Sequence, residues 1–443
     1  MTTVDRREFV RTASVAGIGL AAASAFPSPA LLLRGRPSAR VVVAVAGLNG
    51  RGAVLAQNFA RSANTEVAHL CDVDANVLAK QRGVVQASAA RVPTAIGDFR
   101  RALDDREVDA IAIAAPDFWH TPMALLALAA GKHVYVEKPA SHGPREVELL
   151  VEAQRKHGRL VQIGNQQRSA PRTIEAIAMI RDGAIGHPYL ARTWYANTRG
   201  SIGRGTSVPV PAHLDYELWQ GPAPRTPYRD NVIHYNWHWF RRWGTGEICN
   251  NGTHEIDVAR WALGVDRPVR VASTGGRFHF ADDWEFPDTQ EAVFEFDGGR
   301  TITWRGQSCN GVRTFDRGRG VQIVGTNGSL LLDRDGYVLH DLAGKVVREG
   351  KEAAIADGLD FAGNDAHTTA HVENFAAAVR EREPLRSPVA EIAKSLMLCH
   401  LGNIAQLTGR QLRIDADAGR LMDDADAMRY WQREYAPGWA PRV

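Results

Sequence analysis

A glycine-rich segment near the start of the chain has the residue types and spacing of a dinucleotide-binding turn. It reads Gly47-Leu48-Asn49-Gly50-Arg51-Gly52 and lies between a predicted strand and a predicted helix. Gly47 permits a tight turn and Gly52 permits close packing of helix on strand, while free amides at the helix start face the pyrophosphate. Asn49 occupies the middle position of the fingerprint, which is usually glycine. The segment alone is therefore weak evidence for a dinucleotide site.

An acidic residue strengthens this interpretation. Asp72 lies 20 residues beyond Gly52, directly after a predicted strand over 66–71. A carboxylate in this place accepts hydrogen bonds from ribose hydroxyls and repels a 2′-phosphate. The turn and the acid together predict NAD as cofactor, with NADP less favoured. The alternative is that Asp72 is a turn or N-cap residue for the helix predicted from Ala75.

The elements that would position these residues alternate between buried strands and helices, as in a parallel sheet. Short apolar runs predict strands over 40–46, 66–71, 108–114, 133–136 and 160–163. Helices are predicted over 53–60, from 75, over 122–130 and over 144–157. Asp72, His120 and Lys138 follow three of these strands. Because ligands of such sheets bind beyond the carboxyl ends of strands, we expect these side chains to border one site.

Composition excludes several other classes of protein. The 443 residues include 53 Lys and Arg and 50 Asp and Glu, a formal charge of only +3, whereas nucleic-acid-binding proteins carry a clustered basic excess. The four cysteines are too few for a disulfide scaffold and show no C-x-x-C spacing. No apolar run reaches the roughly 18 to 20 residues that span a bilayer. We expect a soluble globular protein without stable membrane insertion.

The N-terminus resembles a twin-arginine export signal. Arg6-Arg7 is followed by Phe9, then by an apolar stretch over 15–26 that contains Ala23-Ser24-Ala25 as a candidate cleavage site. We therefore expect residues 1–37 to be signal and linker. The protein would fold in the cytoplasm, engage the twin-arginine export machinery and become periplasmic or secreted. The alternative is a frayed amphipathic N-terminus that happens to contain two arginines.

Over about residues 40–410 the chain resembles the Gfo/Idh/MocA family, which is named after glucose–fructose oxidoreductase, inositol dehydrogenase and MocA. The motifs are the glycine-rich segment, Cys71-Asp72, the segment 115–120, Val136-Glu137-Lys138-Pro139, and the segments 163–168, 252–261 and 371–375. The resemblance implies an α/β fold. A Rossmann NAD-binding domain would occupy 38–163. A C-terminal substrate and oligomerisation domain with a large open, mostly antiparallel sheet would occupy 164–410, followed by an extension over 411–443.

The pattern after Gly164 fits this second domain. Alternating apolar and polar residues predict antiparallel strands over 291–296, 301–306 and 321–324. Turn signals over 297–299 and 326–328 separate them. Helices are predicted over 255–263, 372–380 and 389–407.

The resemblance also implies a catalytic group. Lys138 would hydrogen-bond the reacting oxygen, and His254 would accept the alcohol proton. Asn250 stands where inositol-dehydrogenase-like members carry an aspartate, which would make His254 a weaker base and argues against both this proton route and an inositol-like substrate. The alternative is that His254 mainly hydrogen-bonds a substrate hydroxyl. Asp257 could orient the His254 ring, or it could serve the packing of the helix.

Further residues are assigned to ligand binding on the same ground. Those expected to bind the cofactor are Gly47, Asn49, Gly50, Arg51, Gly52, Asp72, Pro116, Trp119, His120, Glu137, Lys138 and Gln166. Those expected to bind the substrate are Arg168, Trp194, Tyr235, His238 and Asp257.

The segment 194–243 is rich in tryptophan and tyrosine and contains His234 and His238. Aromatic faces beside polar groups suit a sugar ring, but Trp and Tyr also dominate interfaces and loop cores, and both readings stay open. The two histidines have the spacing of helical metal ligands, yet the segment is not clearly helical, so we expect no metal.

Together these features predict an exported NAD-dependent oxidoreductase that transfers hydride between a tightly bound cofactor and a hydroxyl carbon of a sugar or glycoside. Outside the cytoplasm there is no soluble NAD pool, so the cofactor would be reset within each cycle or by a second substrate. One alternative is a redox-neutral glycoside hydrolase acting through a transient keto sugar. Another is a non-catalytic sugar-binding or sensor protein. The resemblance implies a homodimer or homotetramer.

Overall fold

The structure is a computed structural model that describes residues 40–89, 91–352, 365–415 and 417–443. The expected twin-arginine signal and linker over 1–37 lie outside these residues. Among the described helices, none combines the length and the apolar character needed to cross a membrane.

The first sheet has six parallel strands in the order β3-β2-β1-β4-β5-β6. They are β1 (Val41–Ala46), β2 (Thr65–Cys71), β3 (Thr94–Ile96), β4 (Ala110–Ile113), β5 (His133–Val136) and β6 (Val161–Ile163). All of β4 and nearly all of β1 are buried, as expected for strands covered on both faces. The strand order reverses between β1 and β4, so the turn after β1 lies at the topological switch point, where such sheets bind ligands.

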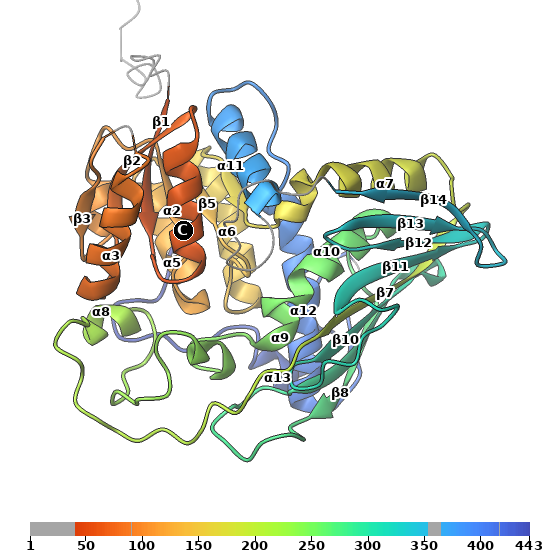
Figure 1. Ribbon diagram of the computed structural model, residues 1–443. Helices are drawn as coiled ribbons and strands as arrows, with labels where there is room; N and C mark the ends of the chain where they lie inside the picture. The colour runs from red at the N-terminus through yellow and green to blue at the C-terminus, as the bar shows by residue number, and fades with distance from the viewer. Residues whose placement is uncertain (1–39, 90, 353–364, 416) are drawn as a thin grey trace, which may run out of the picture. The chain divides into compact units, whose positions relative to one another are not determined.

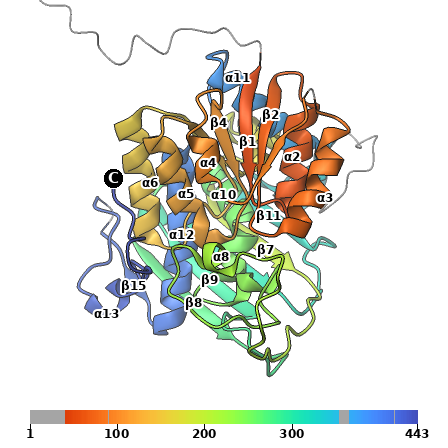
Figure 2. The same ribbon diagram turned by 90° about the vertical axis from the view of Figure 1, so that its left-hand side faces the viewer.

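Helices cover both faces of this sheet (Figures 1 and 2). One face carries α2 (Arg51–Arg61), α3 (Ala75–Gln86) and α11 (Asp365–Val379). The other carries α4 (Arg100–Leu103), α5 (Asp117–Ala129), α6 (Pro144–His157) and part of α12 (Val389–Thr408). Helices from late in the chain thus help to bury the first sheet.

The second sheet has nine strands in the order β14-β13-β12-β11-β7-β10-β9-β8-β15. They are β7 (Pro188–Ala196), β8 (Arg270–Gly276), β9 (Thr289–Glu295), β10 (Thr301–Gln307), β11 (Arg319–Gly325), β12 (Gly328–Leu332), β13 (Gly336–His340), β14 (Val346–Lys351) and β15 (Leu412–Arg413). All neighbours are antiparallel except β7 and β10. Both expected domain folds, and the predicted strands of this sheet, are confirmed.

Helices α7 (Pro171–Arg181), α10 (Gly252–Leu263) and α12 pack on one face of the second sheet, and Figure 1 shows α10 and α12 between the two sheets. Residues along β10 alternate between buried and partly exposed, because successive side chains of a strand point to opposite faces. The buried set meets α10, while the other face carries polar side chains such as Arg192 and Gln322, which hydrogen-bond each other.

Two helices begin several residues earlier than predicted. The helix expected over 372–380 is α11, which begins at Asp365. The helix expected over 122–130 is α5, which begins at Asp117 and contains Pro122. Proline inside a helix lacks the N–H that would bond the carbonyl four residues earlier. Here that carbonyl, on Phe118, accepts a hydrogen bond from Arg433 Nη2 at 2.7 Å. A distant residue therefore satisfies the group, which no local pattern could reveal.

A long, largely irregular segment over 197–243 joins β7 to α9 (Gly246–Asn250); we call it the bridging segment. It contains α8 (Tyr216–Gln220) and a 3-10 helix over Asn236–Trp239. Although it follows a strand of the second sheet, it bonds to the first domain. The Ala75 amide donates to the His213 carbonyl at 2.8 Å, and the Trp119 indole donates to the Trp219 carbonyl at 2.8 Å.

The C-terminal residues also return to the first domain. After α13 (Ala425–Met428), the Arg433 guanidinium pairs with Glu146 at 2.7 Å. The Trp439 ring lies edge-on to Trp119, with centroids 5.1 Å apart. The end of the chain therefore supports the α5–α6 side of the Rossmann domain.

Candidate active site

The glycine turn has the close approach that a dinucleotide cradle requires. Gly47 has a φ of +80°, and a Cβ there would lie 2.5 Å from the Ala115 nitrogen. A Cβ on Gly52 would lie 1.6 Å from the Gly47 oxygen, so α2 packs against the turn only because this residue is glycine. Asn49 and Gly50 are exposed at the tip of the turn. Asn49 in the middle position therefore leaves the cradle intact, and the residues present fit a dinucleotide.

Asp72 belongs to this turn and does not cap the next helix. Its carboxylate accepts hydrogen bonds from the Leu48 amide at 2.6 Å and the Asp74 amide at 2.9 Å. The N-cap of α3 is Asp74, whose side chain accepts from the amides of Asn76 and Val77. The N-cap alternative for Asp72 is therefore wrong. Burial raises the pKa of Asp72, although the two amides oppose that change.

A cavity of about 650 Å³ lies at the carboxyl ends of β1, β2, β4 and β5 and is closed on its far side by the second domain. It brings together most of the residues predicted for cofactor binding and catalysis. The predicted residues that line it are Gly47, Asn49, Gly50, Arg51, Asp72, Pro116, Trp119, His120, Glu137, Lys138, Gln166, Tyr235, His238, Asn250 and His254. Gly52 lies behind the turn, where it permits the packing described above.

Lys138 and Asn250 are joined across the two domains. The Lys138 ammonium follows β5 and donates to the Asn250 carbonyl at 2.6 Å and to its side-chain Oδ1 at 3.2 Å. The Asn250 Nδ2 donates to Glu247 at 3.4 Å. An amide can accept from the cation and donate to the carboxylate at once, whereas an aspartate would face Glu247 with a second negative charge. Burial lowers the pKa of Lys138.

His254 lies in the first turn of α10 and is 3% exposed. Burial lowers its pKa well below the usual range, and the charges of Arg334, Lys138 and Arg319 act in the same direction. The imidazole is therefore held neutral, with a ring nitrogen able to accept a hydrogen bond, and it is a weaker base than a solvent-exposed histidine. Within the described part of the chain its Nδ1 has no hydrogen-bond partner.

Two models of one family match this chain. The NAD-binding Rossmann domain of the Gfo/Idh/MocA oxidoreductase family matches residues 41–165, and the C-terminal alpha/beta domain of the same family matches residues 192–440. The chain belongs to this family. It is an NAD-dependent oxidoreductase of the class that acts on CH–OH groups, as expected from its sequence.

Individual relatives are more distant. The chain is 28% identical over 328 residues to inositol 2-dehydrogenase from Rubrobacter xylanophilus, covering 72% of this chain and 78% of that protein. It is 33% identical over 168 residues to a glycosyl hydrolase family 109 protein from Solibacter usitatus, covering 35% of this chain and 38% of that protein. Its fold is similar to that of aldose-aldose oxidoreductase from Caulobacter crescentus, with a TM-score of 0.63, 21% identity, and coverage of 85% and 100% of the two chains.

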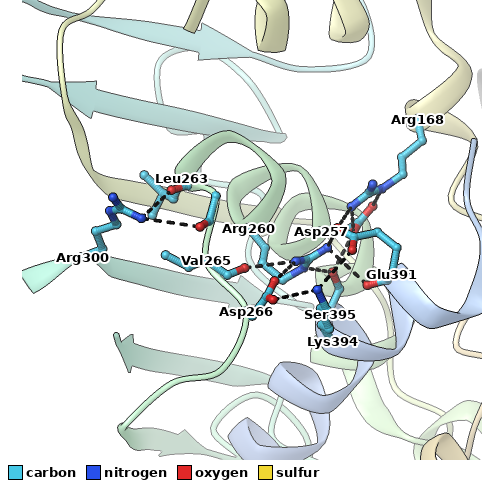
Figure 3. A network of polar contacts seen from close by, with 11 residues as sticks. Arg168, Asp257, Arg260, Leu263, Val265, Asp266, Arg300, Glu391, Lys394 and Ser395 are labelled. Carbon is cyan, nitrogen blue, oxygen red and sulfur yellow. Dashed lines mark hydrogen bonds and ion pairs between the residues drawn. The ribbon is translucent and has the colours of Figure 1, made fainter. Parts of the chain in front are cut away.

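Arg168 and Asp257 do not line the cavity, which corrects their assignment to substrate binding. The Arg168 guanidinium forms two bonds of 2.7 Å to the Asp257 carboxylate (Figure 3). Asp257 also accepts from the Ser395 hydroxyl at 2.6 Å, and the pair is 5% and 1% exposed. Asp257 therefore does not orient the His254 ring. These charges satisfy each other in the interior, between α10, α12 and the 3-10 helix over Gln166–Ser169.

Trp194 is also wrongly assigned to the substrate site. It is 2% exposed, and its indole donates to the Arg317 carbonyl at 2.9 Å. The next residue on β7, Tyr195, lines the cavity instead. Because adjacent strand residues point to opposite faces, a shift of one position moves the aromatic ring from one side of the sheet to the other.

The bridging segment combines both roles that the sequence left open. Trp219, Trp237 and Trp243 belong to a buried core cluster. Tyr235 and His238 line the cavity; the Tyr235 hydroxyl accepts from Arg199 at 2.6 Å, and the His238 ring stacks on Trp237 with centroids 3.6 Å apart. Burial lowers the pKa of His238 to about 3.

His234 and His238 of this segment have separate partners. His238 bonds the Tyr235 carbonyl at 2.6 Å, whereas His234 bonds Asp74 at 3.0 Å. His238 therefore stabilises the segment locally, and His234 links the segment to the Rossmann domain.

Several cavity residues were not predicted from the sequence. Among those from the second domain are Tyr195, Arg199, Asn251, Arg319 and Arg334. Arg319 begins β11, and Arg334 lies in the turn between β12 and β13. Neither arginine belongs to a recognisable motif, so only the pairing of the strands brings them to the site.

Proposed function

We propose that this protein is an exported oxidoreductase that transfers hydride between a tightly held NAD and a hydroxyl-bearing carbon of a sugar or glycoside. The observation that carries the proposal is the meeting of Lys138, Asn250 and His254 in the cavity that also contains the glycine turn and Asp72. When bound, NAD accepts hydride from the carbon being oxidised or returns it.

Lys138 and His254 have the properties that the protein's share of this reaction requires. An ammonium has three N–H donors, and Lys138 uses two of them on Asn250, so one is free for the reacting oxygen. The neutral His254 can accept the hydroxyl proton during oxidation and return it during reduction. Trp237, Tyr235 and His238 offer ring faces and polar edges beside these groups, which suits a sugar.

The bridging segment supports tight retention of the cofactor. Leu218, Trp219 and His234 line the cavity together with Asp72. The segment is hydrogen-bonded to the first domain through His234 and Asp74, and through the Asp215 amide and the Val73 carbonyl at 3.0 Å. A dinucleotide seated at Asp72 would be released only after such contacts loosen, which slows exchange.

Retention is tested by purifying the protein without added nucleotide, denaturing it and identifying released cofactor by mass. We expect about one NAD per chain. A His234→Ala variant removes the bond to Asp74 and should lose NAD faster during dialysis, whereas Tyr189→Ala on the exposed surface should not. Wild-type protein that is empty and binds NAD weakly would contradict tight retention.

A redox-neutral glycoside hydrolase is the second candidate, and the similarity to a family 109 glycosyl hydrolase favours it. Oxidation beside a ring carbon acidifies its C–H bond, elimination then expels the aglycone, water adds, and hydride returns to the keto sugar. The test is a chromogenic glycoside in D₂O without added NAD. Aglycone release with deuterium in the sugar supports hydrolysis, while a keto product and reduced cofactor support oxidation. Lys138→Ala should abolish either reaction.

Export is proposed from the sequence of residues 1–37. Cell fractionation of the full chain should give a shortened protein outside the cytoplasm, and replacing Arg6 and Arg7 together by lysine should leave the full-length protein inside. Export of the double variant at the wild-type level would exclude the twin-arginine route.

A further inference from the structure

We propose that the sugar substrate carries an anionic oxygen group, a carboxylate or a phosphate, and that Arg334 binds it with Arg319 beside it. This inference rests on the proposed sugar oxidoreductase activity and names the substrate class.

The arginines around the cavity differ in whether they have a carboxylate partner. Arg51 pairs with Glu137 at 2.8 Å, Arg199 with Glu247 at 3.0 Å, and Arg319 with Glu255 at 2.7 Å. Arg334 lines the same cavity and has no hydrogen bond or ion pair to any residue that the structure describes. A largely buried guanidinium is costly unless an anion meets it.

The position of Arg334 is fixed by its turn. The Asp333 carboxylate accepts from the amides of Asp335 and Gly336 at 2.9 and 3.1 Å and also pairs with Arg317. Gly336 has a φ of +137°, and a Cβ there would lie 2.0 Å from the Gly350 oxygen. Arg334 is thus presented to the cavity from a tightly held backbone, a preorganised arrangement that favours ligand binding.

Arg334 lies near the catalytic group. After burial, its charge is the largest influence that lowers the pKa of His254. Burial also lowers the pKa of Arg334 itself to about 9, with repulsion from Arg319 in the same direction. Lys138 adds to this excess of positive charge, because its hydrogen bonds go to the neutral Asn250. An anionic group on the substrate would offset the charge beside the reacting hydroxyl.

The guanidinium geometry suits an oxygen anion. Arg334 offers a planar fork of donors that matches a carboxylate or phosphate in a bidentate arrangement. A neutral hexose leaves this fork without an anionic partner. We therefore expect discrimination by charge at this position, while the aromatic residues that line the same cavity accept the ring of either sugar.

The test is calorimetric titration of the NAD-loaded protein with a hexuronate, a hexose 6-phosphate and the neutral hexose. We expect at least one anionic sugar to bind about 10- to 100-fold more tightly than the neutral hexose. The tighter of the two anions identifies the group. Arg334→Ala should remove this preference by weakening the binding of the anionic sugar, and Arg334→Lys should restore part of it. Arg192→Ala, on the exposed face of the same sheet, should leave the preference intact.

The proposal is overturned by equal binding of all three sugars by the wild type, by tighter binding of the neutral hexose, or by an Arg334→Ala variant that retains the anion preference. If the same variant instead lowers the affinity for NAD and weakens all sugars equally, Arg334 serves the cofactor pyrophosphate and the proposal fails. Binding is read separately from turnover. Anion-selective binding without oxidation or hydrolysis of any sugar would refute the proposed function and leave this site assignment standing.

Discussion

Two buried charged regions of the molecule differ in how their charges are met. In the first, Arg168, Asp257, Arg260, Ser395 and Glu391 bond one another in the interior and leave little capacity for a ligand (Figure 3). In the second, Lys138, His254 and Arg334 border a cavity with donor or acceptor capacity unused. The comparison teaches that saturation of hydrogen bonds, more than charge or burial, separates the structural group from the site.

Replacing Lys138 by alanine is the strongest test of whether the group with unused hydrogen-bonding capacity is the active site. We expect turnover to fall about 10²- to 10⁴-fold, because the reacting oxygen loses its donor. Thermal stability should change little, since the partner left behind, Asn250, is neutral. Steady-state rates and calorimetry measure the two effects, with Lys80→Ala on the exposed surface of α3 as the control. Loss of stability with normal turnover would assign Lys138 to the structural group.

Asp257→Ala should have the opposite effect, with lower stability and unchanged ligand binding. It leaves the Arg168 guanidinium buried without its carboxylate, which costs about 3 to 5 kcal/mol of unfolding free energy. Protein that stays folded should keep its NAD and its affinity for sugar, because neither residue lines the cavity. Urea unfolding and sugar titration measure these quantities. A variant of normal stability with weakened sugar binding would return Asp257 to the substrate site.

The sequence reveals those parts of the fold that local patterns determine. β5 and α6 have the predicted bounds, because apolar runs and an N-terminal proline specify them locally. Lys138 and Asp72 could be placed at the site because each follows a parallel strand whose carboxyl end faces the ligand. The motifs that contain them also indicated this placement.

The residues that the sequence could not place are positioned by contacts with distant parts of the chain. Arg168 and Asp257 lie in motifs of the site, yet each satisfies the other, and this is decided by the packing of α10 against the chain after β6. Trp194 and Tyr195 differ by one position, so the register of β7 between β10 and β11 decides which ring faces the cavity. Arg334 reaches the cavity only because it lies in the turn between β12 and β13.

The two regions should also differ in their response to acid. The pKa of His254 is depressed in the folded state, so the unfolded chain binds its proton first as pH falls below about 6.5, and stability declines by up to ~1.4 kcal/mol per pH unit. Burial tends to raise the pKa of Asp257, but Arg168 prevails and lowers it. Its contribution is therefore present above about pH 4 and lost below.

Urea unfolding between pH 7 and pH 3 separates these windows. His254→Gln should flatten the decline below about pH 6.5, and other buried histidines such as His371, with a pKa of about 4, account for the slope that remains. Asp257→Asn should lower stability by a constant amount above about pH 5, and this deficit should shrink below pH 4. An unchanged slope in His254→Gln would mean that this imidazole is not held neutral by the fold.

The smallest expected effect is that of Asn250→Asp, which changes the site by one charge. The new carboxylate keeps the acceptor for Lys138 but lies beside Glu247, to which the native amide donates at 3.4 Å. Attraction to the added charge should raise the pKa of Lys138 and shift the basic limb of the pH–rate profile up by about one unit. Asn250→Ser, which adds no charge, is the control and should leave that limb in place. If both variants shift the basic limb equally, the shift reflects packing around Lys138. The amide of Asn250 then does not control the pKa of Lys138.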